Sequence, residues 1–240
     1  MNEKDLTERQ QRNFDRRTEW AQENAELITP EGYYWIPSPH YNEREDRDIA
    51  GIVIHTTEGW SGGAKTFQGP DRRASAHFGI ERSGLITQMV NEKDRAWHAG
   101  SRIVNDFTIG IEHAGFADEK AIGDYLGFSR EQIEASAHLV AKLLHKYNLP
   151  PTRAHVFGHA EVGVCKGRER AKPGEPRLGE THGGASCHYD PGPYWNWDDY
   201  MDRVGHYYYG GHVARNVIGM AVIIGSASLA IAALTYRGVG

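Results

Sequence analysis

Apolar residues in the middle of the chain occur in short runs that are typical of buried strands. The first is "AGIVIHTT", residues 50–57, which is rich in β-branched side chains. The stretch "SAHFGIERSGLITQMV", residues 75–90, holds two such runs around a Ser-Gly pair, which predicts a β-hairpin. Further strands are predicted in "FTIGIEHAG", residues 107–115, and in "RAHVFGHAEV", residues 153–162. The pattern therefore predicts a sheet of several strands.

Helical periodicity is clearest over residues 129–147. Ser129 and Gln132 have the spacing of a capping box, and one apolar stripe follows, made of Ile133, Ala137, Val140, Leu144 and Tyr147. Two consecutive prolines end this helix, and residues 197–208 predict a closing helix. Since strands and helices alternate, we expect an α/β fold with a mixed central β-sheet flanked by helices.

The two ends of the chain differ from this middle part. Residues 1–48 are rich in charge and have sparse apolar positions at helical spacing, which predicts a polar N-terminal helix and an irregular lead-in. The domain proper is expected at 49–209. Within it, residues 164–186 are rich in Gly, Lys, Arg and Pro and are interpreted as a loop insertion. Residues 210–240 form a C-terminal tail.

This tail contains the uncharged run "VIGMAVIIGSASLAIAALTY", residues 217–236, between Arg215 and Arg237. A bilayer span needs about 20 such residues, whereas a core helix of a small domain usually has a polar face. We therefore predict a transmembrane helix and a membrane-associated protein, with a buried C-terminal helix as the alternative. The N-terminal "MNEKDLTERQ" does not resemble a secretory signal peptide.

Composition narrows the class of protein. With 25% charged and 39% apolar residues among 240, the chain fits a folded globular body. Its net charge of −5 and the lack of a long basic run predict no binding to nucleic acid. Cys165 and Cys187 are too few for a disulfide scaffold; pairing and free thiols both remain open, with free thiols slightly favoured.

Histidine is the unusual residue of this composition, with 13 copies. His55 and His159 each end a predicted strand, and Asp190 lies in the turn of "CHYDPGPYWNW". Two imidazoles and a carboxylate with an open fourth position are the ligands of many catalytic zinc sites. Spacing alone is weak support for a zinc site, because a histidine at a strand end is more often a structural residue.

Six ordered motifs between residues 50 and 200 add a resemblance. They are "VIHTTEG", "SAHFGIERSGLITQMV", "RAWHAGS", "NDFTIGIEHAG", "FGHAEV" and "HYDPGPYWNW". This set resembles the type 2 N-acetylmuramoyl-L-alanine amidases, whose superfamily includes the peptidoglycan recognition proteins and the phage lysozyme-type amidases. The resemblance implies a peptidoglycan substrate, hydrolysed with one zinc ion at the amide between N-acetylmuramic acid and L-alanine.

The resemblance also implies residue roles. The zinc ligands fall on His55, His159 and Asp190, and the carboxylate that activates water falls on Glu112. His188 stands where the family often has a lysine that stabilises the oxyanion. The "RAWHAG" motif implies that Trp97 and His98 contact substrate. These roles follow from the resemblance and not from the spacing.

Several alternatives remain at this point. His159 and Asp190 are 31 positions apart, farther than in many members of the family, so the third ligand is in doubt: His182, Cys187 and His188 are also able to bind zinc. Asp190 is preferred because "DPGPYWNW" matches the family's turn. His155 is the less favoured alternative to His159. The remaining candidates are expected to be structural: His77, His113, Trp195 and Trp197. Because side chains alternate along a strand, His113 is expected on the opposite face from Glu112.

Two functions outside catalysis compete with the amidase. One is a non-catalytic peptidoglycan-binding receptor, and the other is a membrane-tethered wall-binding protein. The complete set of ligands favours the enzyme, since receptor-type members lack the third ligand. Among biological settings, a phage or prophage endolysin is favoured over a bacterial wall-remodelling or muropeptide-recycling enzyme, because a C-terminal span occurs without a signal peptide.

Overall fold

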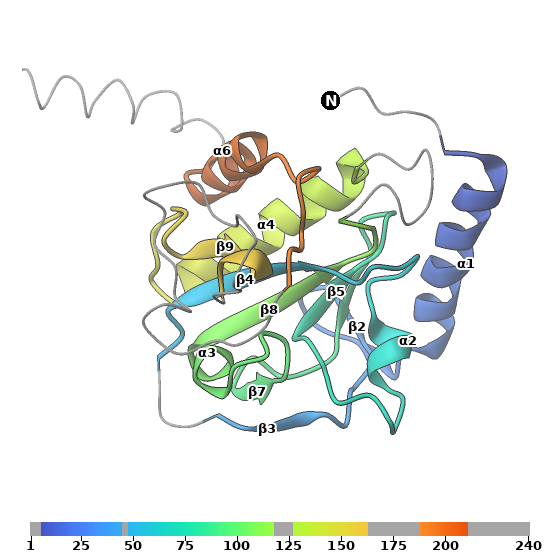
Figure 1. The fold of residues 1–240 in the computed structure, drawn as a ribbon, viewed down its shortest axis with the longest axis horizontal. Coiled ribbons are helices and arrows are strands. Elements are labelled where there is room, and N and C mark those ends of the chain that lie inside the picture. The colour runs from blue at the N-terminus through green and yellow to red at the C-terminus, as the bar shows by residue number, and fades with distance from the viewer. Residues whose placement is uncertain (1–5, 45–47, 118–126, 163–187, 211–240) are drawn as a thin grey trace, which may run out of the picture.

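A mixed β-sheet forms the centre of the structure (Figure 1). The structure is a computed structural model, and it describes residues 6–44, 48–117, 127–162 and 188–210. Within these ranges the sheet has seven strands in the order β1-β2-β6-β5-β8-β4-β9. β4 runs parallel to β8 and β9, β5 runs parallel to β8, and β5 and β6 form the predicted antiparallel hairpin. The strands are β1 (Leu27–Ile28), β2 (Tyr34–Trp35), β4 (Gly51–Thr56), β5 (Phe78–Ile80), β6 (Ile86–Gln88), β8 (Thr108–His113) and β9 (Val156–Gly158).

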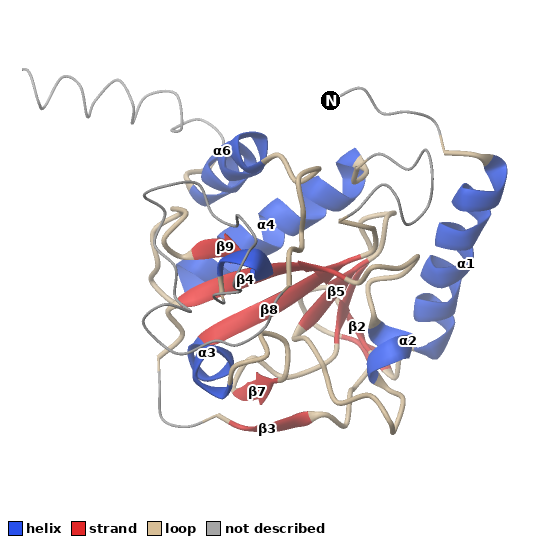
Figure 2. Ribbon diagram, in the orientation of Figure 1, coloured by secondary structure: helices blue, strands red, loops and turns tan. Residues whose placement is uncertain are grey.

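Helices lie on both sides of this sheet, as Figure 2 shows. All six residues of β4 are buried, which explains why the strand is a nearly continuous apolar run. Ile52 and Ile54 pack toward α4 (Arg130–Lys146), while Val53 packs on the opposite face with residues of α3 (Arg102–Phe107). The predicted mixed α/β architecture is therefore confirmed.

Strand alternation assigns the site residues to one face. His55 follows Val53 by two positions and shares its face of the sheet. On β8, Ile109 and Ile111 pack in the core with α4, so Glu112 points to the same side as His55. The register pairs His55 with Glu112 across the two parallel strands. One surface of the sheet thus carries both groups.

α4 begins as the sequence predicts. Ser129 is its N-cap, and the hydroxyl accepts a hydrogen bond from the backbone N–H of Gln132. The Gln132 amide does not complete a capping box; it donates instead to the carbonyls of Ile80 and Ala114, at the ends of two strands. The predicted capping box is therefore only half formed, because the Gln132 side chain is directed toward these carbonyls and not back to the N-cap.

The closing helix α6 (Trp197–Tyr208) packs along α4. Arg203 of α6 binds Glu134 of α4 and also Asp199 of its own helix. Trp195 is buried against Tyr200, at a ring distance of 4.7 Å. The prediction that this tryptophan is a structural residue is confirmed.

The N-terminal region is more closely integrated than its composition suggests. α1 (Glu8–Asn24) is the predicted helix, and its Phe14 is buried with the ring 5.0 Å from that of Trp60. The lead-in that was expected to be irregular contributes β1 and β2 to the main sheet, while β3 (Tyr41–Glu43) pairs with β7 (Asp94–Ala96). These strands of two or three residues are too short to show a period in the sequence.

Three sequence predictions lie outside the described residues: the insertion at 164–186, the state of Cys165 and Cys187, and the span at 217–236. Within the ranges that the structure does describe, no helix combines the length and the apolar character that crossing a membrane requires.

Candidate metal centre and active site

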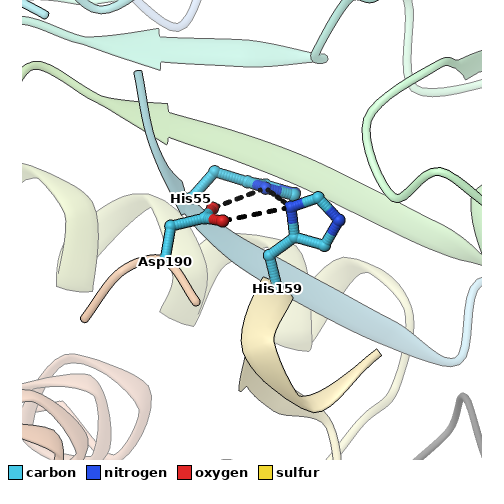
Figure 3. A group of neighbouring side chains, drawn as sticks. All are labelled: His55, His159 and Asp190. Atoms are coloured by element: carbon cyan, nitrogen blue, oxygen red, sulfur yellow. Dashed lines mark hydrogen bonds and ion pairs between the residues drawn. The ribbon is translucent and has the colours of Figure 1, made fainter. Parts of the chain in front are cut away.

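Parallel strands bring two of the predicted ligands together. His55 is the fifth residue of β4, and His159 opens the short 3-10 helix η2 (His159–Glu161) directly after β9. Because β4 and β9 are neighbouring parallel strands, their carboxyl ends meet at one edge of the sheet. Asp190 reaches the same place from the turn that precedes α6 (Figure 3).

The three side chains form a tight cluster. His55 Nδ1 lies 3.0 Å from His159 Nδ1 and 3.1 Å from Asp190 Oδ2, and His159 Nδ1 lies 3.3 Å from Asp190 Oδ1. One ligand atom from each residue lies within 4.8 Å of the others, and all three residues are buried. In the described part of the chain, this is the group of histidine, cysteine and carboxylate side chains that is able to hold a metal ion.

Close backbone contacts position the turn that carries Asp190. The carbonyl of Asp190 accepts a hydrogen bond of 2.9 Å from Ala160 N, next to His159. Gly158 makes room for the turn, since a Cβ at this position would lie 2.7 Å from Pro191 Cδ. On the other side, Gly192 has φ +80° and packs against the backbone of Ala117. The ligand-bearing turn is therefore held between β9 and the segment after β8.

The protonation states of the cluster suit a cation. Burial lowers the pKa of His55 to about 4, and the neighbouring His159 lowers it further in the same direction. Burial alone would raise the pKa of Asp190, but the imidazoles of His159 and His55, which lie against its carboxylate, outweigh this effect and leave the pKa below its ordinary value. Neutral imidazole and ionised carboxylate are the forms that bind metal ions.

Glu112 lies beside this cluster on β8. Burial raises the pKa of its carboxyl well above the ordinary value, and the nearby charge of Asp190 acts in the same direction. Among the described residues, its Oε2 atom is buried without a hydrogen-bond partner. A carboxylate with a raised pKa and an uncommitted oxygen is a stronger proton acceptor than an ordinary carboxylate.

His188 approaches from the solvent side. Its ring stacks on that of His159, with the ring centres 4.1 Å apart, and its Nδ1 lies 3.6 Å from Asp190 Oδ1. Burial and then the charge of His159 lower the pKa of His188. At neutral pH its imidazole is therefore neutral and offers one N–H.

Trp97 and His98 of the "RAWHAG" motif lie in different environments. Trp97 is half-buried, and its Nε1 donates to Asn42 at 2.8 Å. His98 is only 7% exposed, and its ring nitrogens lie within hydrogen-bond distance of His55 and Thr108. Its role in substrate binding stays a prediction, and the structure places its ring directly beside that of His55.

Three other histidines lie where they were expected, while the alternative ligand His182 lies outside the described residues. His113 faces α4, where its Nε2 lies 2.7 Å from Ser136 Oγ, which confirms the opposite face. His77 is fully buried, and its Nδ1 accepts a hydrogen bond from Gly110 N. The partly buried His155 contacts the carbonyl of Ala50 and takes no part in the cluster.

Sequence reasoning missed a hollow beside Glu112. The loop Thr57–Ser61 after β4 forms one wall, and Arg17 of α1, Lys65 of α2 (Ala64–Phe67) and Arg72 form much of the rest. Arg72 and Glu58 lie close enough to Glu112 to act on the pKa of its carboxyl. These cations are far apart in the sequence, so only the fold brings them together.

Residues 45–193 match the family model described as N-acetylmuramoyl-L-alanine amidase. This match covers more than half of the chain, which therefore belongs to that family of enzymes. The fold and the cluster of His55, His159 and Asp190 agree with the membership.

Individual members of this family are similar to the chain over most of their length. N-acetylmuramoyl-L-alanine amidase A of Achromobacter lyticus is 31% identical over 190 residues, which cover 71% of this chain and 92% of that protein. The 1,6-anhydro-N-acetylmuramyl-L-alanine amidase AmpD of Haemophilus influenzae is 31% identical over 195 residues, 70% of this chain and 90% of the relative. A solved structure of an AmpD selenomethionine derivative is 26% identical, with a TM-score of 0.50 over 71% of this chain and 93% of that one.

Proposed function

We propose that the protein is a zinc-dependent hydrolase that cleaves the amide between N-acetylmuramic acid and L-alanine in peptidoglycan. The observation that carries the proposal is the buried cluster of His55, His159 and Asp190 with Glu112 on the adjoining strand. Membership in the amidase family supports the choice of bond.

The donor set fits zinc. Two imidazole nitrogens and one carboxylate oxygen leave an open position, as in catalytic zinc sites, whereas Mg²⁺ and Ca²⁺ prefer oxygen ligands only. Zinc held by His55, His159 and Asp190 supplies Lewis-acid chemistry, which polarises the amide carbonyl and makes water more acidic. Their burial also excludes competing solvent.

Glu112 is proposed to move the proton. Its carboxylate takes a proton from the attacking water as oxygen adds to the carbonyl carbon, and returns it to the L-alanine nitrogen as the C–N bond breaks. The products are a carboxylate on the muramic acid side and a free amine on the peptide. The raised pKa suits the first step, because it makes the carboxylate a stronger base toward the attacking water.

His188 is proposed to stabilise the oxyanion. Its ring stacks on His159 at the exposed side of the cluster, where the carbonyl oxygen of a substrate would approach. Because the imidazole is neutral, it acts by donating its single N–H and not by carrying a positive charge.

The surroundings suit an acidic muropeptide. The positive charges of Arg17, Lys65 and Arg72 exceed the single negative charge of Glu58 in the hollow, so we place the carboxylates of the stem peptide there. Trp97 lies in a second hollow with Asn42, Ser101 and Asn105, which we assign to contacts with the glycan or peptide.

The decisive experiment pairs two buried glutamates. Glu112→Gln in the full chain should keep wild-type zinc content and lose most turnover of purified peptidoglycan, measured by mass spectrometry of the released stem peptides. Glu81→Gln is the matched control: Glu81 is also buried, its pKa is raised to about 7 by burial, and it directly follows the neighbouring strand β5.

The outcomes separate the competing functions. Wild-type protein that binds peptidoglycan without releasing peptides would support the receptor instead, and Glu112→Gln at the wild-type rate would assign the proton transfer elsewhere. Protein purified without zinc that regains no activity when zinc is added would refute the metal assignment.

Two further assignments rest on the sequence. We propose that residues 217–236 anchor the protein in a membrane, because the run is uncharged and long enough to span. The setting of a phage or prophage endolysin also stays a prediction, and the curated relatives named above come from bacteria.

A further inference from the structure

A chain of hydrogen bonds leads from His55 away from the cluster to a backbone carbonyl. His55 Nε2 lies 3.1 Å from His98 Nδ1, and His98 Nε2 lies 3.2 Å from the hydroxyl of Thr108. This hydroxyl is 2.6 Å from the carbonyl oxygen of Val104. All four residues are buried, so water does not compete for these bonds.

The direction of each bond can be worked out from the carbonyl. A carbonyl oxygen only accepts, so the Thr108 hydroxyl donates its single proton to Val104 O. Toward His98 the hydroxyl oxygen is then left as an acceptor. The hydrogen between these two groups must therefore sit on His98 Nε2.

His98 passes this constraint on to His55. The His98 ring is buried, and its two nitrogens face another imidazole and a hydroxyl with no carboxylate to pair a charge, so we take the ring as neutral with one N–H. With that proton on Nε2, the Nδ1 of His98 accepts, and the hydrogen of the next bond must lie on His55 Nε2. Neutral His55 then has a bare Nδ1, the atom that faces His159 and Asp190.

We propose that His98 and Thr108 are positioning residues that fix His55 in its Nε2–H tautomer and keep the Nδ1 lone pair available to a metal ion. The inference rests on the proposed zinc function. Metal-binding histidines commonly donate their second N–H to a carboxylate or carbonyl. Here a second imidazole accepts it, and that imidazole is itself oriented by a threonine hydroxyl.

Packing holds the His98 ring in the required orientation. A Cβ at Gly110 would lie 2.4 Å from His98 Cγ, so the ring rests directly on the glycine in the middle of β8. The ring of His77 meets it edge-on, with the ring centres 5.7 Å apart. The competing acceptor for a proton on His55 is Asp190 Oδ2, at 3.1 Å from Nδ1. His159 Nδ1, at 3.0 Å from the same atom, is a second competing acceptor, so the tautomer depends on which side of the His55 ring holds the proton.

The first test reads the tautomer directly. In the zinc-free full chain at neutral pH, nitrogen-15 NMR of the imidazoles distinguishes a proton on Nε2 from one on Nδ1. We expect Nε2–H for His55 in the wild type. A proton on Nδ1 of His55 would overturn the inference, whatever the protein does to peptidoglycan.

The second test removes the end of the chain without changing its shape. Thr108→Val should weaken zinc binding about 10- to 100-fold in a chelator competition assay, and Thr108→Ser should restore it. Thr87→Val is the matched control, because Thr87 is also fully buried and its hydroxyl also bonds a carbonyl, that of Gly79. Equal zinc affinity in Thr108→Val and Thr87→Val would overturn the inference.

His98 offers a rescue that a purely structural role would not produce. Asn places its amide oxygen near the position of Nδ1, so His98→Asn can still accept from His55, whereas His98→Leu cannot. We expect zinc affinity in the order wild type, His98→Asn, His98→Leu, and equal losses in both variants would contradict the mechanism. A wild type that binds zinc but leaves peptidoglycan intact would refute the proposed function alone, since the tautomer and affinity would still be measured.

Discussion

Gly158→Ala is the sharpest test of how the third ligand is positioned. A methyl group at residue 158 would lie 2.7 Å from Pro191 Cδ, 3.2 Å from Trp197 Cζ2 and 3.3 Å from the carbonyl of Asp190. Ordinary contacts begin at 3.4 Å, so β9 and the turn must separate by about 0.7 Å (3.4 − 2.7) along the first of these lines. Neither the proline ring nor the backbone can rotate away.

The size of the effect follows from this displacement. Overpacking of this kind costs about 1–3 kcal/mol of folding free energy. Because Asp190 directly precedes the displaced proline, its carboxylate moves relative to His159, and we expect zinc affinity to fall about 10-fold, or about 1.4 kcal/mol. Turnover should fall by about 10- to 100-fold, since small misplacements of reacting groups have effects of this order.

The assay compares thermal unfolding in chelator and in excess zinc. The zinc-dependent increase in Tm reports binding to the folded state and separates the loss of affinity from the loss of stability. Gly205→Ala is the control, because Gly205 lies inside α6 with open space around it. That substitution should stabilise the protein by about 0.5–1 kcal/mol. Wild-type zinc affinity and turnover in Gly158→Ala would refute the reasoning.

The remaining predictions concern the ligands, the oxyanion and the tail. His159→Ala should abolish zinc binding and activity, while His155→Ala should leave both unchanged, as read by metal analysis and peptide release; equal effects would refute the assignment. His188→Ala should lower kcat more than it raises KM in steady-state kinetics, and a change in KM alone would indicate ground-state binding. Truncation after Gly210 should give an active protein in the soluble fraction, while the full chain stays with membranes in high salt; a soluble full chain would contradict a span at 217–236.

The central elements were predictable because their patterns are long. β4 and β8 are buried on both faces and α4 carries a regular stripe, so apolar runs and helical spacing locate all three. The positions of His55 and His159 at the ends of apolar strands follow from the same logic, whereas their proposed role as ligands came from the resemblance to the amidases. The short strands β1 and β2 carry no period, and their place in the sheet depends on contacts that sequence patterns do not encode.

The role of His98 depends on information that sequence does not contain. The "RAWHAG" motif marks His98 as important, but only the distances to His55 and Thr108 show which groups it contacts. Gln132 illustrates the same limit, since its spacing from Ser129 predicts a local bond while two distant carbonyls receive its amide. Side chains with several available partners choose between them in three dimensions.

The order of strands in the sheet also governs when the site can form during synthesis. β4 emerges early, but its partners come much later: Glu112 is 57 positions after His55 (112 − 55), and Gly158 is 104 positions after Ile54 (158 − 54). Parallel strands that are this far apart in the sequence pair slowly, and until then the apolar strand β4 has no neighbouring strand to pair with. A nascent chain therefore carries His55 long before His159 and Asp190, and with the proposed site it gains hydrolytic activity only after the turn at residue 190 has been made and has closed onto β9.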